Sequence, residues 1–157
     1  MIMRNRKISR LRRGQKQFLS SSEEAIIISA IAMAEKGNRG ELRLHIEKKC
    51  PQKNILDRCG ILFRNMGMEN TIENTGILLY ISIDDQKVAV YSEMSLHKKA
   101  GTVFWNRVLS SITEKFSKHS YVEGICSAIE HIGGFMRNEF PGTDISGNEL
   151  SNEISGL

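Results

Sequence analysis

Hydrophobic and polar residues alternate strictly over residues 41–47, a pattern that predicts a β-strand. Its apolar side chains point one way, while the charged ones and His45 point the other, so we expect an edge strand with one exposed face. Residues 76–81 are continuously apolar, as a strand buried on both faces must be. Residues 84–86 predict a tight turn that leads back into a third strand over residues 87–91.

Four further segments carry the apolar spacing of helices. The first begins at a capping box, formed by Ser20 with Glu23 or by Ser21 with Glu24, and should end near Lys36. The other three are expected over residues 54–66, 105–116 and 122–140.

The predicted order of elements is therefore α-β-α-β-β-α-α. The first two strands flank a helical crossover, so they should be parallel, and the second and third form an antiparallel hairpin. Apolar helices on both faces of such a sheet predict an α/β fold, a small three-layer α/β/α sandwich around a short mixed sheet.

Composition agrees with one globular domain. The chain has 157 residues, of which 40% are hydrophobic and 25% charged, and the mass is 17.7 kDa. No apolar run approaches the roughly 20 residues of a transmembrane helix. Three cysteines without metal-ligand spacing predict free thiols, which fit a reducing, cytoplasmic setting.

Charge divides the chain into three parts. Residues 1–19 carry seven basic side chains and no acidic one. The remaining residues carry the other 15 of the 22 basic side chains and all 18 acidic ones. We expect residues 1–19 to be a disordered basic leader and residues 142–157 a disordered acidic tail, with the domain over residues 20–141. The leader either contacts anionic surfaces, such as nucleic-acid phosphates or lipid headgroups, or is a solvated extension. No apolar segment of a secretory signal follows it.

The predicted first helix is apolar almost all round, since only Ser29 is polar over residues 25–34. A helix that covers one face of a small sheet needs only an apolar stripe. Three alternatives are open for the extra apolar surface. It is buried within the monomer, it packs against a partner such as a second copy in a homo-oligomer, or it lies on a membrane surface.

The predicted topology brings candidate ligands together. Parallel strands one and two start at the same end of the sheet, and the antiparallel third strand finishes at that end. Glu41, Thr75, Ser92 and Glu93 should therefore converge, and their oxygen atoms suit a hard cation such as calcium or magnesium. His97, expected in the loop after the third strand, is the candidate catalytic acid or base. The chain contains no Gly-rich phosphate loop and no nucleophile elbow.

The segment Gly40-Glu41-Leu42-Arg43-Leu44-His45-Ile46-Glu47 resembles the "GEIRVHIE" strand of short, cytoplasmic bacterial members of the TPM domain family. The resemblance spans about residues 18–141. It continues through residues 62–68, 74–81, 104–105, 121–124, 128–130 and 140–141.

This resemblance implies a Rossmann-like α/β/α sandwich, divalent-cation binding and a link to phosphatase activity. The family's polar pattern matches Glu41, but Thr75 stands where Asn is expected, and Ser92-Glu93 stands where the family has Gly-Asp. Ser95 likewise replaces a later Gly. We therefore expect a degraded or retuned cation site.

Two functions from different classes remain open. The first is a TPM-like domain with a modest calcium or magnesium site, held by Glu41, Thr75, Ser92 and Glu93, that serves phosphate-ester hydrolysis. The second is a non-catalytic interaction module that uses residues 25–34 for self-association or docking.

Overall fold

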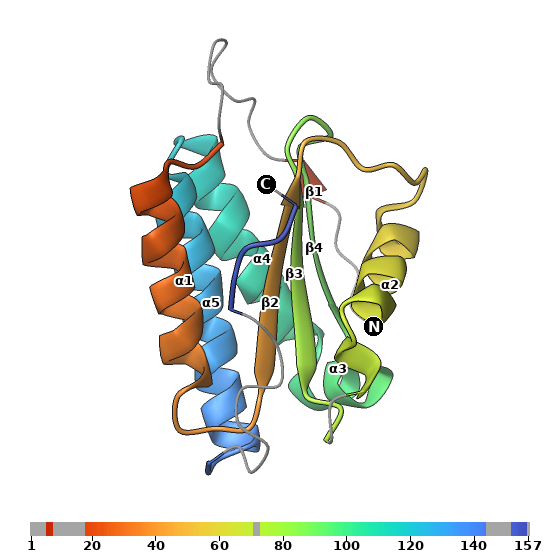
Figure 1. Ribbon diagram of the computed structural model, residues 1–157, viewed down its shortest axis with the longest axis vertical. Helices are drawn as coiled ribbons and strands as arrows, with labels where there is room; N and C mark the ends of the chain where they lie inside the picture. The colour runs from red at the N-terminus through yellow and green to blue at the C-terminus, as the bar shows by residue number, and fades with distance from the viewer. Residues whose placement is uncertain (1–5, 8–17, 71–72, 144–151, 157) are drawn as a thin grey trace.

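A computed structural model describes residues 6–7, 18–70, 73–143 and 152–156 (Figure 1). The strands are β1 (Arg6–Lys7), β2 (Glu41–Glu47), β3 (Gly76–Ser82) and β4 (Lys87–Ser92). The helices are α1 (Ser21–Glu35), α2 (Ile55–Asn65), α3 (Met94–Ala100), α4 (Thr102–Ser117) and α5 (Tyr121–Glu139), and a 3₁₀ turn, η1, spans Met68–Asn70.

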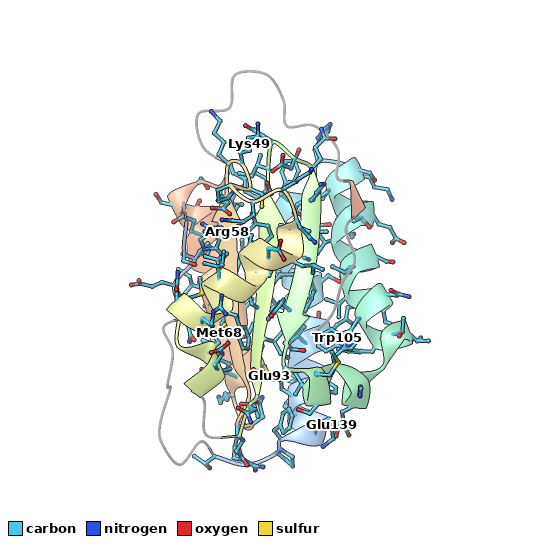
Figure 2. All side chains as sticks on the ribbon, turned by 90° about the vertical axis from the view of Figure 1, so that its right-hand side faces the viewer. Lys49, Arg58, Met68, Glu93, Trp105 and Glu139 are labelled. Atoms are coloured by element: carbon cyan, nitrogen blue, oxygen red, sulfur yellow. The ribbon has the colours of Figure 1, made fainter. Side chains whose placement is uncertain are left out.

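The sheet has the order β1-β4-β3-β2. β2 and β3 are parallel, whereas β3–β4 and β1–β4 are antiparallel. In Figure 1, α1, α4 and α5 cover one face of the sheet, and α2 lies on the other. Figure 2 shows α2, which carries Arg58, in front of the sheet. The expected mixed α/β fold is confirmed.

Each face of the sheet has its own apolar core. Leu42, Leu79 and Trp105 belong to the larger core, beneath α1, α4 and α5. Leu78 and Phe63 belong to the smaller core, beneath α2. The two cores follow from side-chain alternation, because neighbouring residues of one strand point to opposite faces.

Local signals correctly predicted where α1 and α2 begin. Ser20 and Glu23 form a capping box at the start of α1, with Ser20 Oγ accepting from the Glu23 amide at 3.2 Å. Asn54 caps α2 by accepting from the Leu56 amide at 3.0 Å. The observed start of α1 therefore selects the first of the two capping alternatives.

The expected order of elements lacked two of the observed ones. Residues 94–100 form helix α3, where a loop was expected, so His97 lies on a helix. Arg6–Lys7, within the predicted leader, pairs with β4. Most of the leader lies outside the described residues, so its predicted extent of residues 1–19 stays a prediction.

The expected exposed face of β2 is wrong. Glu41 is 2% exposed and His45 6% exposed, so that face of the strand is covered. His45 stacks on Tyr80 of the neighbouring strand, and Ser155 lies against its ring. The free edge of β2 is not bare either, since Ser155 of the predicted acidic tail forms a parallel bridge with His45. Residues 144–151 of that tail lie outside the described residues.

Candidate functional site

The strand register places the backbones of the predicted cation ligands at one end of the sheet, where β2 and β3 begin and β4 finishes. Glu41 pairs with Gly76, and Ser92 pairs with Ile77 on the far side of β3. The Glu41 amide donates to the Thr75 carbonyl at 3.3 Å. Glu93 follows directly and is the residue that precedes α3. The backbones of Glu41, Thr75 and Ser92 therefore lie at the same end of the sheet.

The side chains do not gather in the same way. Alternation puts Glu41 on the α2 face with Gly76, whereas Ser92 lies on the opposite face with Ile77. The Thr75 hydroxyl donates to the Arg39 carbonyl at 2.9 Å, and the Ser92 hydroxyl donates to the Glu93 carbonyl at 3.3 Å. Both hydroxyls thus hold local backbone structure.

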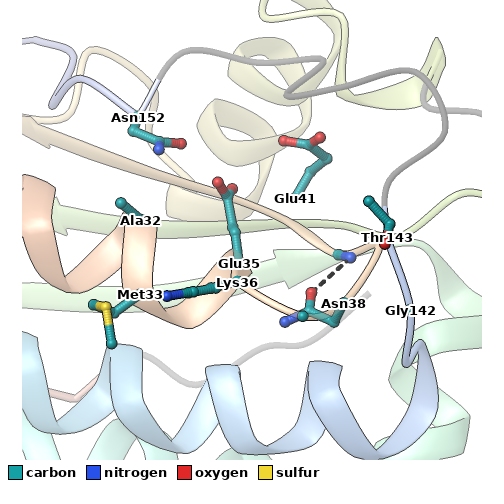
Figure 3. A pocket seen from close by; sticks show the side chains of 11 residues that line it. Ala32, Met33, Glu35, Lys36, Asn38, Glu41, Gly142, Thr143 and Asn152 are labelled. Carbon is teal, nitrogen blue, oxygen red and sulfur yellow. Dashed lines mark hydrogen bonds between the residues drawn. The ribbon is translucent and has the colours of Figure 1, made fainter.

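Glu41 instead lines a cavity of about 510 Å³ beside the end of α1 (Figure 3). The carboxylates of Glu35 and Glu41 and the amide of Asn152 are labelled in Figure 3 among the groups that line this cavity. The cavity is lined by Ala32, Met33, Glu35, Lys36, Gly37, Asn38, Gly40, Glu41, Gly142, Thr143 and Asn152.

Hydrogen bonds of the turn between α1 and β2 hold the cavity wall in place. The Asn38 side chain donates to the Ala34 carbonyl at 2.7 Å and accepts from the Gly40 amide at 2.8 Å. Glu35 Oε1 accepts from the Leu42 amide at 2.8 Å. One carboxylate oxygen of Glu35 is thereby fixed by the backbone at the start of the strand.

The segment after α5 closes the other side of the same turn. The Arg39 amide donates to the Phe140 carbonyl at 2.8 Å, and the Gly142 amide donates to the Gly37 carbonyl at 3.1 Å. These contacts bring Thr143 to the cavity, although it is about 100 residues from Glu41 along the chain.

The side chains that line this cavity include several oxygen donors. Two carboxylates, side-chain amides and a hydroxyl offer oxygen ligands, the type that calcium and magnesium prefer. Within the described ranges, however, no group of three or more His, Cys, Asp or Glu side chains is arranged to hold a metal ion. A cation in this cavity would therefore need neutral oxygen atoms to complete its ligands.

His97 is not among the residues that line the cavity. It lies on α3, half-buried, and its backbone carbonyl accepts from the Trp105 indole at 3.2 Å. Burial lowers the pKa of the His97 imidazole, so its neutral form is favoured at pH 7. Its assignment as catalytic acid or base stays a prediction.

The buried thiols are poor nucleophiles. Burial raises the pKa of Cys59 to about 12 and also raises the pKa of Cys126. Since the thiolate is the reactive form, neither residue offers covalent catalysis near neutral pH.

A second polar cluster lies between β2 and α2, at the other end of the strand. Arg58 binds both carboxylate oxygens of Glu47 at 2.8 Å, and the Tyr80 hydroxyl donates to Glu47 Oε1 at 2.6 Å. Burial alone would raise the pKa of Glu47, but the bonds from Arg58 and Tyr80 hold it below its usual value. His45 stacks on Tyr80 at 5.9 Å between ring centroids, and burial lowers its pKa.

Sequence reasoning missed Glu35, Asn38, Thr143 and Asn152. The pattern Glu35-Lys36-Gly37-Asn38 at the end of a helix is a local turn signal that could have drawn attention to the first two. No local signal marks Thr143 or Asn152, because only long-range contacts bring them to the cavity.

Fold and site define a small mixed α/β domain with a carboxylate-lined cavity at the edge of its sheet. The TPM domain model matches residues 13–135, which is most of the chain. The chain therefore belongs to the TPM domain family. The match begins inside the predicted leader, and the expected boundary at residue 20 stays a prediction.

The solved structures that are similar to this chain include the following two. BA42 protein from the psychrophilic bacterium Bizionia argentinensis is 30% identical over 90% of this chain and 97% of its own, with a TM-score of 0.81. The N-terminal domain of cg2496 protein from Corynebacterium glutamicum has a TM-score of 0.57 at 7% identity and covers 86% of this chain and 92% of its own. The second likeness shows the fold alone. No curated protein matches the chain.

Proposed function

We propose that this TPM domain binds a divalent cation, calcium or magnesium, in the cavity between α1 and β2. The observation that carries the proposal is that Glu35, Glu41 and Asn152 line one cavity and bring two carboxylates and a side-chain amide to it. Of the predicted ligands, Glu41 keeps its role. Glu35 and Asn152 take the places of the other three predicted ligands. The hydroxyls of Thr75 and Ser92 bind backbone carbonyls, and Glu93 does not line the cavity.

A calcium titration followed by backbone amide shifts tests this site. We expect saturable shifts for residues 35–42, 142–143 and 152, with a dissociation constant on the order of millimolar, because few charged ligands are present. Glu41→Gln and Glu35→Gln should each weaken binding by about tenfold, since each removes one negative charge while keeping the shape of the side chain. Glu35→Gln also retains an acceptor for the Leu42 amide.

Glu93→Gln is the matched control. It removes the same charge at the same edge of the sheet but outside the cavity, so calcium binding should be unchanged. Equal weakening by Glu93→Gln would return the site to the predicted set of Glu41, Thr75, Ser92 and Glu93. The absence of any shift up to millimolar calcium would end the cation proposal.

Phosphatase activity is the finer part of the proposal. A bound divalent cation would polarise a phosphoryl oxygen and lower the pKa of water. Glu35 and Glu41 would hold it, and Lys36, which lines the cavity, would attract the phosphate charge. His97, the proton donor predicted from the sequence, lies outside this cavity and favours its neutral form, so we assign it no step here. Hydrolysis of a generic phosphomonoester with magnesium present, lost in Glu41→Gln, would support this activity.

The finer description of the fold belongs to the same proposal. Helices on both faces of the sheet and the parallel β2-α2-β3 crossover support a three-layer, Rossmann-like sandwich. Among the described residues, no helix is long and apolar enough to cross a membrane. A cytoplasmic location and contact of the basic leader with anionic surfaces stay predictions.

A second candidate function is self-association through α1. Ile26 is 54% exposed and Met33 63% exposed on this helix, and Ala25 and Ala32 are exposed beside them. Apolar side chains that repeat on the outer face of a helix are typical of a surface that packs against a partner.

Sedimentation equilibrium at several concentrations tests the second candidate. We expect a reversible dimer whose association constant falls at least about tenfold in Ile26→Glu/Met33→Glu, because charges are costly in an apolar interface. Val103→Glu is the control: Val103 is 76% exposed, but it lies on α4. A strict monomer at all concentrations would remove this candidate.

A further inference from the structure

The free edge of β2 is covered by the chain's own residues 152–156, called here the edge segment (Figure 1). The Ile46 amide donates to the Ser155 carbonyl at 3.0 Å, and the Ser155 amide donates to the Leu44 carbonyl at 3.1 Å. This is the start of a parallel ladder on a sheet edge. Sheets bind extended peptides by adding a strand in the same way.

Side-chain contacts make this edge selective. Ser155 Oγ lies 2.8 Å from Nδ1 of His45, which is 6% exposed, and it also donates to the Leu44 carbonyl at 3.4 Å. The preceding residue, Ile154, packs partly buried against the larger core. The edge thus accepts an apolar side chain followed by a hydroxyl.

The next position accepts glycine only. Gly156 has φ +91°, a conformation that side chains other than glycine rarely adopt. A Cβ there would lie 2.3 Å from the Ile46 carbonyl oxygen and 2.9 Å from the His45 ring. The positive φ and the short distances to Ile46 and His45 each exclude a residue other than glycine at this position.

We propose that the edge of β2 is a binding site for an extended peptide with the pattern apolar residue, hydroxyl residue, glycine, and that residues 154–156 fill this site in cis. The cis occupant has an effective concentration on the order of millimolar, so a separate peptide binds once the edge segment is weakened or displaced. Asn152 belongs to the same segment, so its displacement also removes one wall of the cavity.

Amide hydrogen exchange at Ile46 reports directly on occupancy, because the Ile46 amide donates to the edge segment. In full-length Gly156→Ala we expect exchange at Ile46 to be at least about tenfold faster, because the weakened edge segment leaves the Ile46 amide more often. A synthetic peptide with the sequence of residues 150–157, added to this variant, should restore the protection. The same peptide carrying Gly156→Ala should not.

Two controls separate this result from a general loss of structure. Gly134→Ala makes the same replacement where no atom lies within 4 Å, and should leave Ile46 exchange unchanged. The Leu79 amide, in the central strand, should stay protected in every variant. If Gly156→Ala also exposes Leu79, the milder Ser155→Ala variant carries the test, with faster Ile46 exchange and a shifted His45 Nδ1 resonance expected.

Unchanged Ile46 exchange in the variant that keeps its fold would show that the edge segment does not protect β2. Failure of the wild-type peptide to restore protection would overturn the binding site, and equal rescue by the Gly156→Ala peptide would overturn the glycine requirement. None of these outcomes depends on calcium, so this proposal and the proposed cation site can fail separately.

Discussion

Gly133→Ala is expected to lower the free energy of unfolding by about 2 kcal/mol, although alanine is the better helix former. Gly133 lies in α5 where this helix packs against α1. A Cβ at this position would lie 2.9 Å from the Cβ and 3.0 Å from the Cα of Ala34. Backbone cannot move aside as a flexible side chain can, so the two helices must separate. Urea unfolding followed by circular dichroism measures the change.

Gly134→Ala is the matched control, on the next residue of the same helix. A Cβ there meets nothing within 4 Å, so the variant should be more stable than the wild type by about 0.5–1 kcal/mol. Equal effects of the two substitutions would mean that close packing of α1 and α5 does not decide the role of Gly133.

Arg58→Met is expected to lower the free energy of unfolding by about 3 kcal/mol, because it leaves the buried Glu47 carboxylate without its cation. The side chains of Arg58 and Glu47 are only 20% and 15% exposed, so water replaces the lost partner poorly. Thermal and urea unfolding at neutral pH, where Glu47 is ionised, measure the loss.

The double variant Arg58→Met/Glu47→Gln should recover most of the lost stability, since it removes the uncompensated charge and keeps an acceptor for the Tyr80 hydroxyl. Lys115→Met is the control, because the Lys115–Glu123 pair is 3.1 Å long but 47% and 67% exposed. It should change stability by about 0.5 kcal/mol at most. If the double variant is no more stable than Arg58→Met, the buried charge is not the cause of the loss.

The glycines of α5 show which part of helix packing a sequence pattern predicts and which part it does not. Gly124, Gly133 and Gly134 within one helix predict a backbone pressed against a neighbour. The structure confirms this for Gly124 and Gly133, whose added Cβ atoms would meet atoms at 3.0 and 2.9 Å, but not for Gly134. The helix period tells which positions share a face, but not which of them a neighbour approaches most closely.

The candidate site shows the same division. Parallel and antiparallel pairing could be predicted from the order of elements, and it brought Glu41, Thr75 and Ser92 to one edge of the sheet. The direction of each side chain relative to the sheet depends on register and alternation together, and these separate Ser92 from Glu41. The cavity that Glu41 lines therefore contains Glu35 and not Glu93.

The amino-acid sequence alone determined strands β2, β3 and β4, the caps of the first two helices, the mixed sheet and the family, because each depends on residues near one another in the chain or on a collinear pattern. Only the tertiary structure decided what covers the free edge of β2 and what surrounds Glu41. The contact between His45 and Ser155 joins positions 110 residues apart. Such contacts arise from the packing of the whole domain, and no local periodicity encodes them.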